Sequence, residues 1–130
     1  MSPRSTTFER STQETRIEVR LDLDGERQIE VRTGLPFFDH MLNALAFHAG
    51  WDLWLECHGD LAVDDHHTVE DCALALGTAI DRCLGDRAGI TRFGSAYAPL
   101  DEALARVVVD LSGRPAPVVS LGLRRERLGD

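Results

Sequence analysis

The sequence predicts an α+β fold in which a β-β-α-β-β-α unit is followed by the opening hairpin of a second such unit. Apolar residues alternate over residues 15–23 and 51–57, the period of strands with one buried face. Over residues 37–49 and 68–84 they recur every three to four positions, as in amphipathic helices. Short turn-forming segments separate these elements, so we expect helices layered on a mostly antiparallel sheet.

The first expected feature is a hairpin. Its strands are residues 15–23 and 28–32, and they are joined through Asp24-Gly25, a dipeptide favoured in tight hairpin turns. Residues 1 to about 12 are polar and are expected to be loose until something orders them.

Two helices are expected to follow. The first, residues 37–49, begins after Pro36 and ends at Gly50. The second, residues 68–84, ends at Gly85, and its Thr68 and Asp71 have the spacing of a capping box. The sequence thus predicts two covering helices with ordinary end signals.

The chain is expected to divide into two domains, and the remaining elements in both are strands. Residues 1–92 form the first βα unit with the histidine-rich motif, and residues 93–130 form an incomplete second unit. The strands still to be placed are 51–57 and 61–63 in the first unit, and the hairpin partners 103–111 and 116–123 in the second.

Composition excludes several classes of function. The formal net charge is −8, which argues against nonspecific binding to nucleic acid or to anionic membranes. All 14 basic residues are arginine, so a Schiff-base lysine and a Walker-A lysine are excluded. No apolar run approaches membrane-spanning length and the first residues do not resemble a signal peptide, so we expect a cytoplasmic protein. The cysteines are expected to be buried, reduced thiols: Cys57, Cys72 and Cys83.

The histidines are concentrated in one part of the chain. All 5 lie between positions 40 and 67, and His66-His67 is followed by Glu70. Imidazole and carboxylate are usual transition-metal ligands, and Glu70 can approach either ring at helical spacing. Adjacent rings point in different directions, which suits two metals or two subunits better than one ion. The competing interpretation is a polar helix N-terminus, where acids favour the helix dipole.

Other histidines and charged residues are weaker candidates. His40 is a further candidate ligand, His48 is either a ligand or a substrate contact, and His58 is structural or exposed. Arg92 and Arg114 lie in glycine-containing loops, from which arginine can bind phosphate, although most such arginines are solvated. Glu14, at a strand edge, would by itself be an ordinary surface charge.

Seven segments, taken together, resemble the imidazoleglycerol-phosphate dehydratase family and run in the family's order. They cover nearly the whole chain: RSTQET at 10–15, GLPFFDHML at 34–42, GDL at 59–61, DHHTVED at 65–71, GITRFG at 89–94, PLDEA at 99–103 and DLSGRP at 110–115.

The resemblance implies a duplicated unit of the ribosomal protein S5 domain 2-like type and a carbon–oxygen lyase of histidine biosynthesis. Such an enzyme removes water from imidazole glycerol phosphate to give imidazole acetol phosphate. The resemblance also implies a homo-oligomer whose sites are shared between subunits and hold two Mn²⁺ ions each. No nucleic-acid or membrane partner is expected. The implied metal ligands are His40, His66, His67 and Glu70. The implied substrate contacts are Glu14, His40, His48, His66, Glu70, Arg92 and Arg114, and Glu14 and Glu70 are the candidate catalytic carboxylates.

The chemistry is physically consistent. A cation at the substrate's imidazole favours the ring's anionic form, which can expel the neighbouring hydroxyl.

The family continues with a second His-His-x-x-Glu motif and a phosphate-binding lysine, neither of which occurs in this sequence. Two hypotheses follow: an active manganese-dependent dehydratase, or a catalytically inactive fragment that assembles and keeps partial metal binding. A mononuclear zinc hydrolase fits less well, because the histidines lack HExxH spacing.

Overall fold

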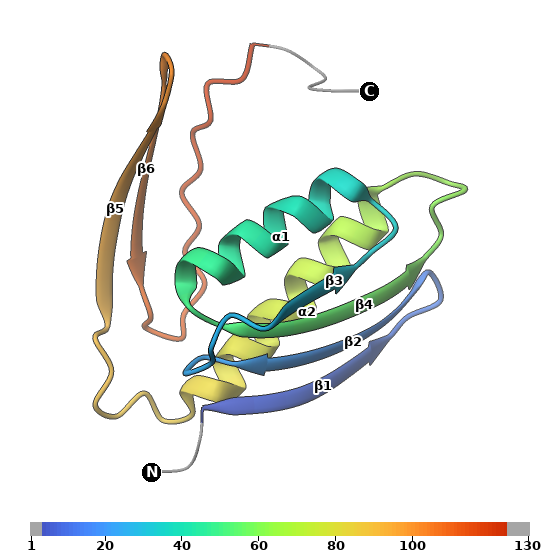
Figure 1. Ribbon diagram of the computed structural model, residues 1–130, viewed down its shortest axis with the longest axis horizontal. Coiled ribbons are helices and arrows are strands. Elements are labelled where there is room, and N and C mark those ends of the chain that lie inside the picture. Colours follow the sequence, from blue (N-terminus) through green and yellow to red (C-terminus); the bar gives the residue numbers. More distant parts are fainter. Residues whose placement is uncertain (1–3, 125–130) are drawn as a thin grey trace. The chain divides into compact units, whose positions relative to one another are not determined.

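The computed structural model describes residues 4–124 and divides the chain into two compact units (Figure 1). The first is Met1–Ile90 and the second is Thr91–Asp130. The division lies close to the boundary at residues 92 and 93 expected from the sequence.

The first unit is a four-stranded sheet with both helices on one face (Figure 1). The strand order is β1-β2-β4-β3, with β3 parallel to β4 and the other pairs antiparallel. The α+β class is as predicted, but the element order is β-β-β-α-β-α. The elements are β1 (Ser5–Ser11), β2 (Thr15–Asp22), β3 (Ile29–Arg32), α1 (Pro36–Ala49), β4 (Asp52–Gly59) and α2 (His66–Leu84).

The N-terminal segment forms a strand, so the expectation that residues 1–12 are loose was wrong from Ser5 onward. Strand β1 pairs with β2 in seven registered positions, from Ser5 opposite Asp22 to Ser11 opposite Arg16. Phe8 packs against the core, and the guanidinium of Arg82 lies 4.2 Å from the centre of its ring. With a single large apolar residue, this edge strand lacks the alternation that would reveal it in the sequence.

The expected hairpin at Asp24-Gly25 was also wrong. Strand β3 does not pair with β2; it crosses to the far side of β4 and pairs with it in parallel. The connection from β2 to β3 is held by Asp52. Its Oδ1 accepts hydrogen bonds from the backbone N–H groups of Glu26 and Gln28, each at 2.7 Å. The chain does turn at residues 23 and 24, but it then continues past β4 instead of returning along β2. The parallel strands β3 and β4 are joined by a crossover connection that contains α1.

The strand expected at residues 61–63 was also wrong, because these residues form a turn. In the turn, the N–H of Val63 donates to the carbonyl of Asp60 at 2.8 Å. Leu61 and Val63 are exposed, so their apolar character does not reflect a buried strand face.

Both helices end as predicted. Gly50, at φ 78°, closes α1, and Gly85 follows the last residue of α2. The predicted capping box at Thr68 and Asp71 was wrong, because α2 begins at His66 and the Asp71 carboxylate is bound by residues of the β1–β2 hairpin. Within residues 4–124, neither helix is long and apolar enough to cross a membrane.

The core lies between the helices and the covered face of the sheet. Alternate residues of β2 and β4 supply its centre, with Ile17 opposite Cys57, Val19 opposite Leu55 and Leu21 opposite Leu53. The helices contribute the other buried apolar residues: Leu42, Ala46, Cys72, Ala75, Leu76, Ala79 and Cys83.

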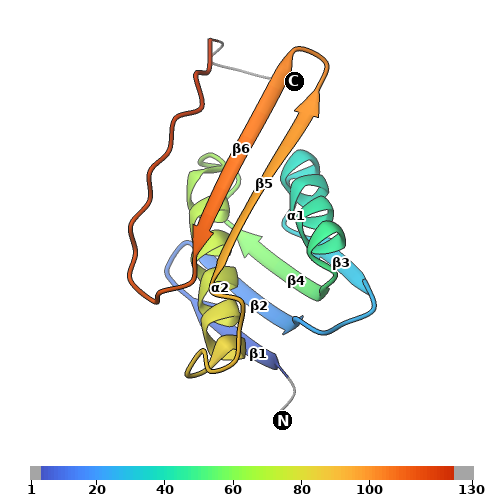
Figure 2. The same ribbon diagram turned by 90° about the vertical axis from the view of Figure 1, so that its left-hand side faces the viewer.

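The second unit is a two-stranded hairpin of β5 (Phe93–Leu100) and β6 (Ala103–Asp110), seen as a long ribbon in Figure 2. Strand β6 agrees with the expected strand at 103–111, but its partner is β5, and the expected strand at 116–123 was wrong. Pro115 and Pro117 lack the backbone N–H that a ladder requires, which disfavours a strand in this segment. Every side chain of both strands is exposed.

Candidate metal and substrate site

Most candidate residues of the first unit gather at one end of its sheet, whereas His48 lies in the last turn of α1, away from them. The parallel strands β3 and β4 both end there, so the helices that follow them, α1 and α2, both begin there. The turn between β1 and β2 lies at the same end, because β2 runs antiparallel to β4 (Figure 1). The topology therefore places three features at this end: the N-terminal part of α1 with His40, the first turn of α2 with His66 and His67, and the turn that carries Glu14.

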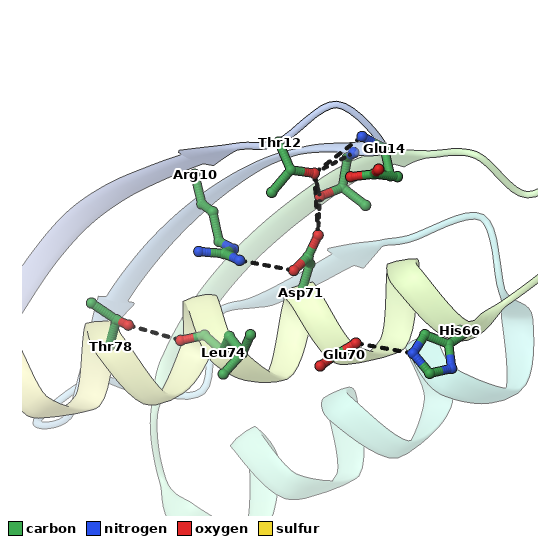
Figure 3. A network of polar contacts seen from close by, with 9 residues as sticks. Arg10, Thr12, Glu14, His66, Glu70, Asp71, Leu74 and Thr78 are labelled. Carbon is green, nitrogen blue, oxygen red and sulfur yellow. Dashed lines mark hydrogen bonds and ion pairs between the residues drawn. The ribbon is translucent and has the colours of Figure 1, made fainter.

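His66 and Glu70 form an exposed pair on α2 (Figure 3). Nε2 of His66 lies 3.0 Å from Oε2 of Glu70, and an ionised carboxylate can only accept, so the imidazole donates. Two ligand atoms at right angles on a divalent ion, with bonds of about 2.1 Å, are also about 3 Å apart. The pair thus has the donor types and the spacing of two neighbouring metal ligands.

His67 is directed elsewhere. Its Nδ1 donates to Oδ2 of Asp60 at 2.8 Å, and its ring is inclined by 84° to that of His66. The hydrogen bond to Asp60 raises the pKa of His67. Burial opposes this rise, and the negative charges of Asp60, Glu14 and Asp64 add to it. The adjacent histidines therefore diverge, as expected from their positions, and each has its own carboxylate partner.

A complete metal centre is not formed by the part of one chain that the structure describes. Among those residues, no group of three or more histidine, cysteine, aspartate or glutamate side chains could hold an ion. Imidazole and carboxylate donors fit manganese chemically, and of the four ligands that the resemblance implies, His66 and Glu70 have their donor atoms 3.0 Å apart.

His40 is placed by the residue that precedes it. Asp39 accepts hydrogen bonds from the backbone N–H of Thr33 at 2.9 Å and from its hydroxyl at 2.5 Å, which ties the first turn of α1 to the end of β3. His40 itself is exposed. Its imidazole is therefore carried on a fixed backbone and remains accessible.

The two other histidines have different surroundings. His48, in the last turn of α1, is exposed and lies edge-on to Phe47 with ring centres 5.5 Å apart. His58, on the uncovered face of β4, pairs with Glu56 at 3.1 Å, in keeping with the structural or exposed role expected for it.

Glu14 lies in the turn between β1 and β2. Its backbone N–H donates to Oγ1 of Thr12 at 3.1 Å, and its negative charge contributes to the raised pKa of His67. Glu14 is exposed, and it is therefore close enough to the start of α2 to act on His67 electrostatically.

The candidate arginines belong to the second unit. Arg92 donates to both carboxylate oxygens of Asp110, at 2.6 and 3.1 Å. Arg114 lines a cavity of about 410 Å³ together with Arg106, Asp110 and Ser112. The sequence did not single out Arg106 or Ser112; their positions near Arg114 follow from the end of β6 and the loop after it.

The cysteines are free and buried, as predicted. Cys57 and Cys72 are neighbours across the helix–sheet interface, and the Cys57 thiol together with burial raises the pKa of Cys72. Burial likewise raises the pKa of Cys83. A raised pKa disfavours the thiolate, so neither Cys72 nor Cys83 resembles a nucleophile.

Comparison with known proteins identifies the family. A family model described as imidazoleglycerol-phosphate dehydratase matches residues 33–130. The chain belongs to the imidazoleglycerol-phosphate dehydratase family. This agrees with the resemblance carried by the ordered motifs of the sequence.

Curated relatives with the dehydratase name extend the match to the whole chain. The Neurospora crassa protein is 50% identical over 154 residues, covering 99% of this chain and 67% of its own length. The Acidithiobacillus ferrooxidans protein is 52% identical over 130 residues, covering 100% of this chain and 65% of its own. The chain thus spans about two thirds of the length of these dehydratases.

Solved dehydratase structures match the fold. The Staphylococcus aureus imidazoleglycerol-phosphate dehydratase superposes with a TM-score of 0.83 at 34% identity, covering 96% of this chain and 68% of that one. The Pyrococcus furiosus dehydratase, solved in complex with (S)-C348, gives a TM-score of 0.71 at 39% identity, with 83% and 56% covered.

Two residues of the candidate site were missed by the sequence reasoning. Asp60 orients His67, yet its position after a glycine indicated only a turn. Asp71 binds three side chains of the β1–β2 hairpin, yet its spacing from Thr68 indicated a capping box. In a sequence, a carboxylate near the start of a helix is explained by helix capping. Only the contacts with other elements of the fold show that it has a different role.

Proposed function

We propose that this chain acts in the manganese-dependent dehydration of imidazole glycerol phosphate to imidazole acetol phosphate, a step of histidine biosynthesis, in the cytoplasm. The observation that carries the proposal is the start of α2, where an imidazole–carboxylate pair 3.0 Å apart lies beside the turn that bears Glu14. Membership in the dehydratase family supports the choice of reaction and substrate.

The metal ligands proposed are His40, His66, His67 and Glu70. A bound divalent cation supplies Lewis acidity and favours the anionic form of the substrate's imidazole ring. Asp60 supports this assignment, because its hydrogen bond to Nδ1 of His67 leaves Nε2 of that ring free to bind.

The proton and the phosphate are assigned to other residues. The Glu14 carboxylate is the proposed base for the C–H proton lost in dehydration, with Glu70 as the second candidate. Arg92 and Arg114 are proposed to bind the phosphate through their guanidinium N–H groups, and His48 to contact the substrate. Arg92 would have to exchange its present carboxylate partner, Asp110, for the phosphate.

A homo-oligomer with sites shared between subunits is part of the proposal. One chain, over its described residues, does not gather three metal donors. Since His66, Glu70 and His40 are exposed, donors from a neighbouring subunit can reach them. Completion by a second subunit is therefore the arrangement that these residues support.

The test combines native mass spectrometry with a turnover assay. We expect manganese to bind in the assembled protein and the substrate to be converted to the ketone product. His66→Gln and Glu70→Gln should each abolish turnover and weaken manganese binding, whereas His58→Gln, at an exposed histidine of β4, should change neither. Assembly with manganese bound but no turnover would favour the alternative, an inactive assembly fragment. Turnover unaffected by both variants would refute the assignment.

A further inference from the structure

We propose that Asp71 is a positioning residue that fastens the β1–β2 turn, and with it Glu14, to the start of α2. The inference rests on the function proposed above for the catalytic role of Glu14, but the fastening itself rests on contacts within the first unit (Figure 3).

Three side chains of the hairpin converge on the Asp71 carboxylate. Oδ2 accepts from the hydroxyl of Thr15 at 2.6 Å and lies 3.4 Å from the hydroxyl of Thr12, while Oδ1 accepts from Nη2 of Arg10 at 3.0 Å. Asp71 is only 8% exposed and Thr15 only 3%. Charge-assisted hydrogen bonds of this kind, shielded from water, are stronger than neutral ones.

The same network defines the backbone of the turn. Oγ1 of Thr12 accepts the N–H of Glu14 at 3.1 Å and the N–H of Thr15 at 3.0 Å. It also lies 3.1 Å from Oγ1 of Thr15. Because the Thr15 hydroxyl gives its proton to Asp71, its oxygen is free to accept from Thr12. An unbroken chain of hydrogen bonds therefore runs from the Glu14 amide through Thr12 and Thr15 to Asp71.

The adjacent carboxylates of α2 have separate tasks. Neighbouring residues on a helix point about 100° apart. Asp71 accordingly faces the sheet, whereas the Glu70 side chain is 59% exposed and pairs with His66. Asp71 is enclosed by Arg10, Thr12 and Thr15, so it has no free oxygen to offer a substrate. The hydrogen bond from Thr15 and the Arg10 charge also lower the pKa of Asp71, which keeps the carboxylate ionised.

The kinetic test separates positioning from general stability. Thr15→Val removes the hydroxyl at nearly constant volume. It should lower kcat roughly tenfold to a hundredfold with little change in KM, because a small displacement of a reacting group greatly slows the chemical step. Thr15→Ser keeps the hydroxyl and should restore most of kcat. Thr78→Val is the matched control, since the hydroxyl of Thr78 bonds only to the carbonyl of Leu74 on the same helix.

A double variant identifies the residue through which the network acts. In a Glu14→Gln background, Thr15→Val and Asp71→Asn should cause no further loss of kcat, because their effect passes through Glu14. Losses that simply multiply with that of Glu14→Gln would show that the network supports folding in general and would overturn the proposal.

A measurement independent of activity keeps the two proposals distinguishable. Amide hydrogen exchange at Glu14 and Thr15 should accelerate at least tenfold in Asp71→Asn and in Thr15→Val, while exchange in the middle of α2 is unchanged. Asp81→Asn, at an exposed carboxylate of the same helix, should leave the turn amides protected. If the wild-type protein shows no turnover, the proposed function fails and exchange alone decides the fastening. Unchanged protection at Glu14 in Thr15→Val refutes it.

Discussion

The imidazole of His67 donates from Nδ1 to the Asp60 carboxylate at 2.8 Å, while the neighbouring His66 is paired with Glu70. A carboxylate on one ring nitrogen fixes the tautomer and makes the opposite nitrogen, Nε2, more basic and free to bind. The structure thus assigns different partners to two histidines that the sequence presents as equivalent.

We predict that Asp60→Asn lowers the pKa of His67, because Asp60 is the largest cause of its elevation. NMR titration of the metal-free protein measures the pKa directly. Since the folded-state pKa is raised, the interaction stabilises the protein fully below the unfolded value of about 6.5 and is lost as pH rises through the folded value. The stability difference between wild type and Asp60→Asn should therefore be largest in mild acid. Asp65→Asn, an adjacent acid whose side chain makes no cap hydrogen bond, serves as the control.

For Asp71 the pH dependence has the opposite sign. The pKa of this carboxyl is lowered, so its contribution is present above the unfolded value of about 3.9 and disappears as pH falls through the folded value. We expect Asp71→Ala to reduce the free energy of unfolding at pH 7 by about 3 kcal/mol, because Arg10 and Thr15 lose their partner. Urea titrations from pH 7 down to pH 3 should show this difference shrinking. A difference independent of pH would contradict the ionised pairing.

Gly59 allows α2 to approach the end of β4. A Cβ at this position would overlap Oγ1 of Thr68 and lie 3.3 Å from Cβ of Thr68. We expect Gly59→Ala to lower stability by about 1–3 kcal/mol, the usual range for overpacking. The double variant Gly59→Ala/Thr68→Ala should recover part of this loss.

Gly77 provides the matched control for that substitution. It lies within α2, and a Cβ there would meet nothing within 4 Å. Gly77→Ala should therefore raise stability by up to about 1 kcal/mol through helix propensity alone. Denaturant midpoints of the single and double variants provide the comparison; equal effects of alanine at positions 59 and 77 would show that the contact with Thr68 is not limiting.

The Asp52 side chain is predicted to stabilise the connection between β2 and β3. Asp52→Ala leaves the N–H groups of Glu26 and Gln28 without their acceptor and should lower stability by about 1–2 kcal/mol. Asp52→Asn retains an acceptor oxygen and should lower it less. Thermal unfolding of the pair measures the difference, and equal losses in the two variants would argue that the charge matters more than the hydrogen bonds.

Local sequence patterns predicted the helices well. The apolar periodicity and the glycines at positions 50 and 85 determine where α1 and α2 end, because helix ends depend on nearby residues. The patterns were less reliable for strands. Asp24-Gly25 is a good turn sequence, but whether β2 and β3 become neighbours depends on β4, which is more than 20 residues away from that turn.

In the candidate site, too, some features follow from the sequence and others only from the tertiary structure. The sequence alone determined the family, the α+β class and the concentration of imidazole and carboxylate groups around residues 66–70, since these depend on residue identity and order. Only the tertiary structure decided that His66 pairs with Glu70 and His67 with Asp60, and that Asp71 binds the turn of Glu14. The partners of His66 and His67 depend on the side-chain directions at the start of α2. The partners of Asp71 depend on which strands lie beside that helix, and contacts between residues distant in the chain fix them.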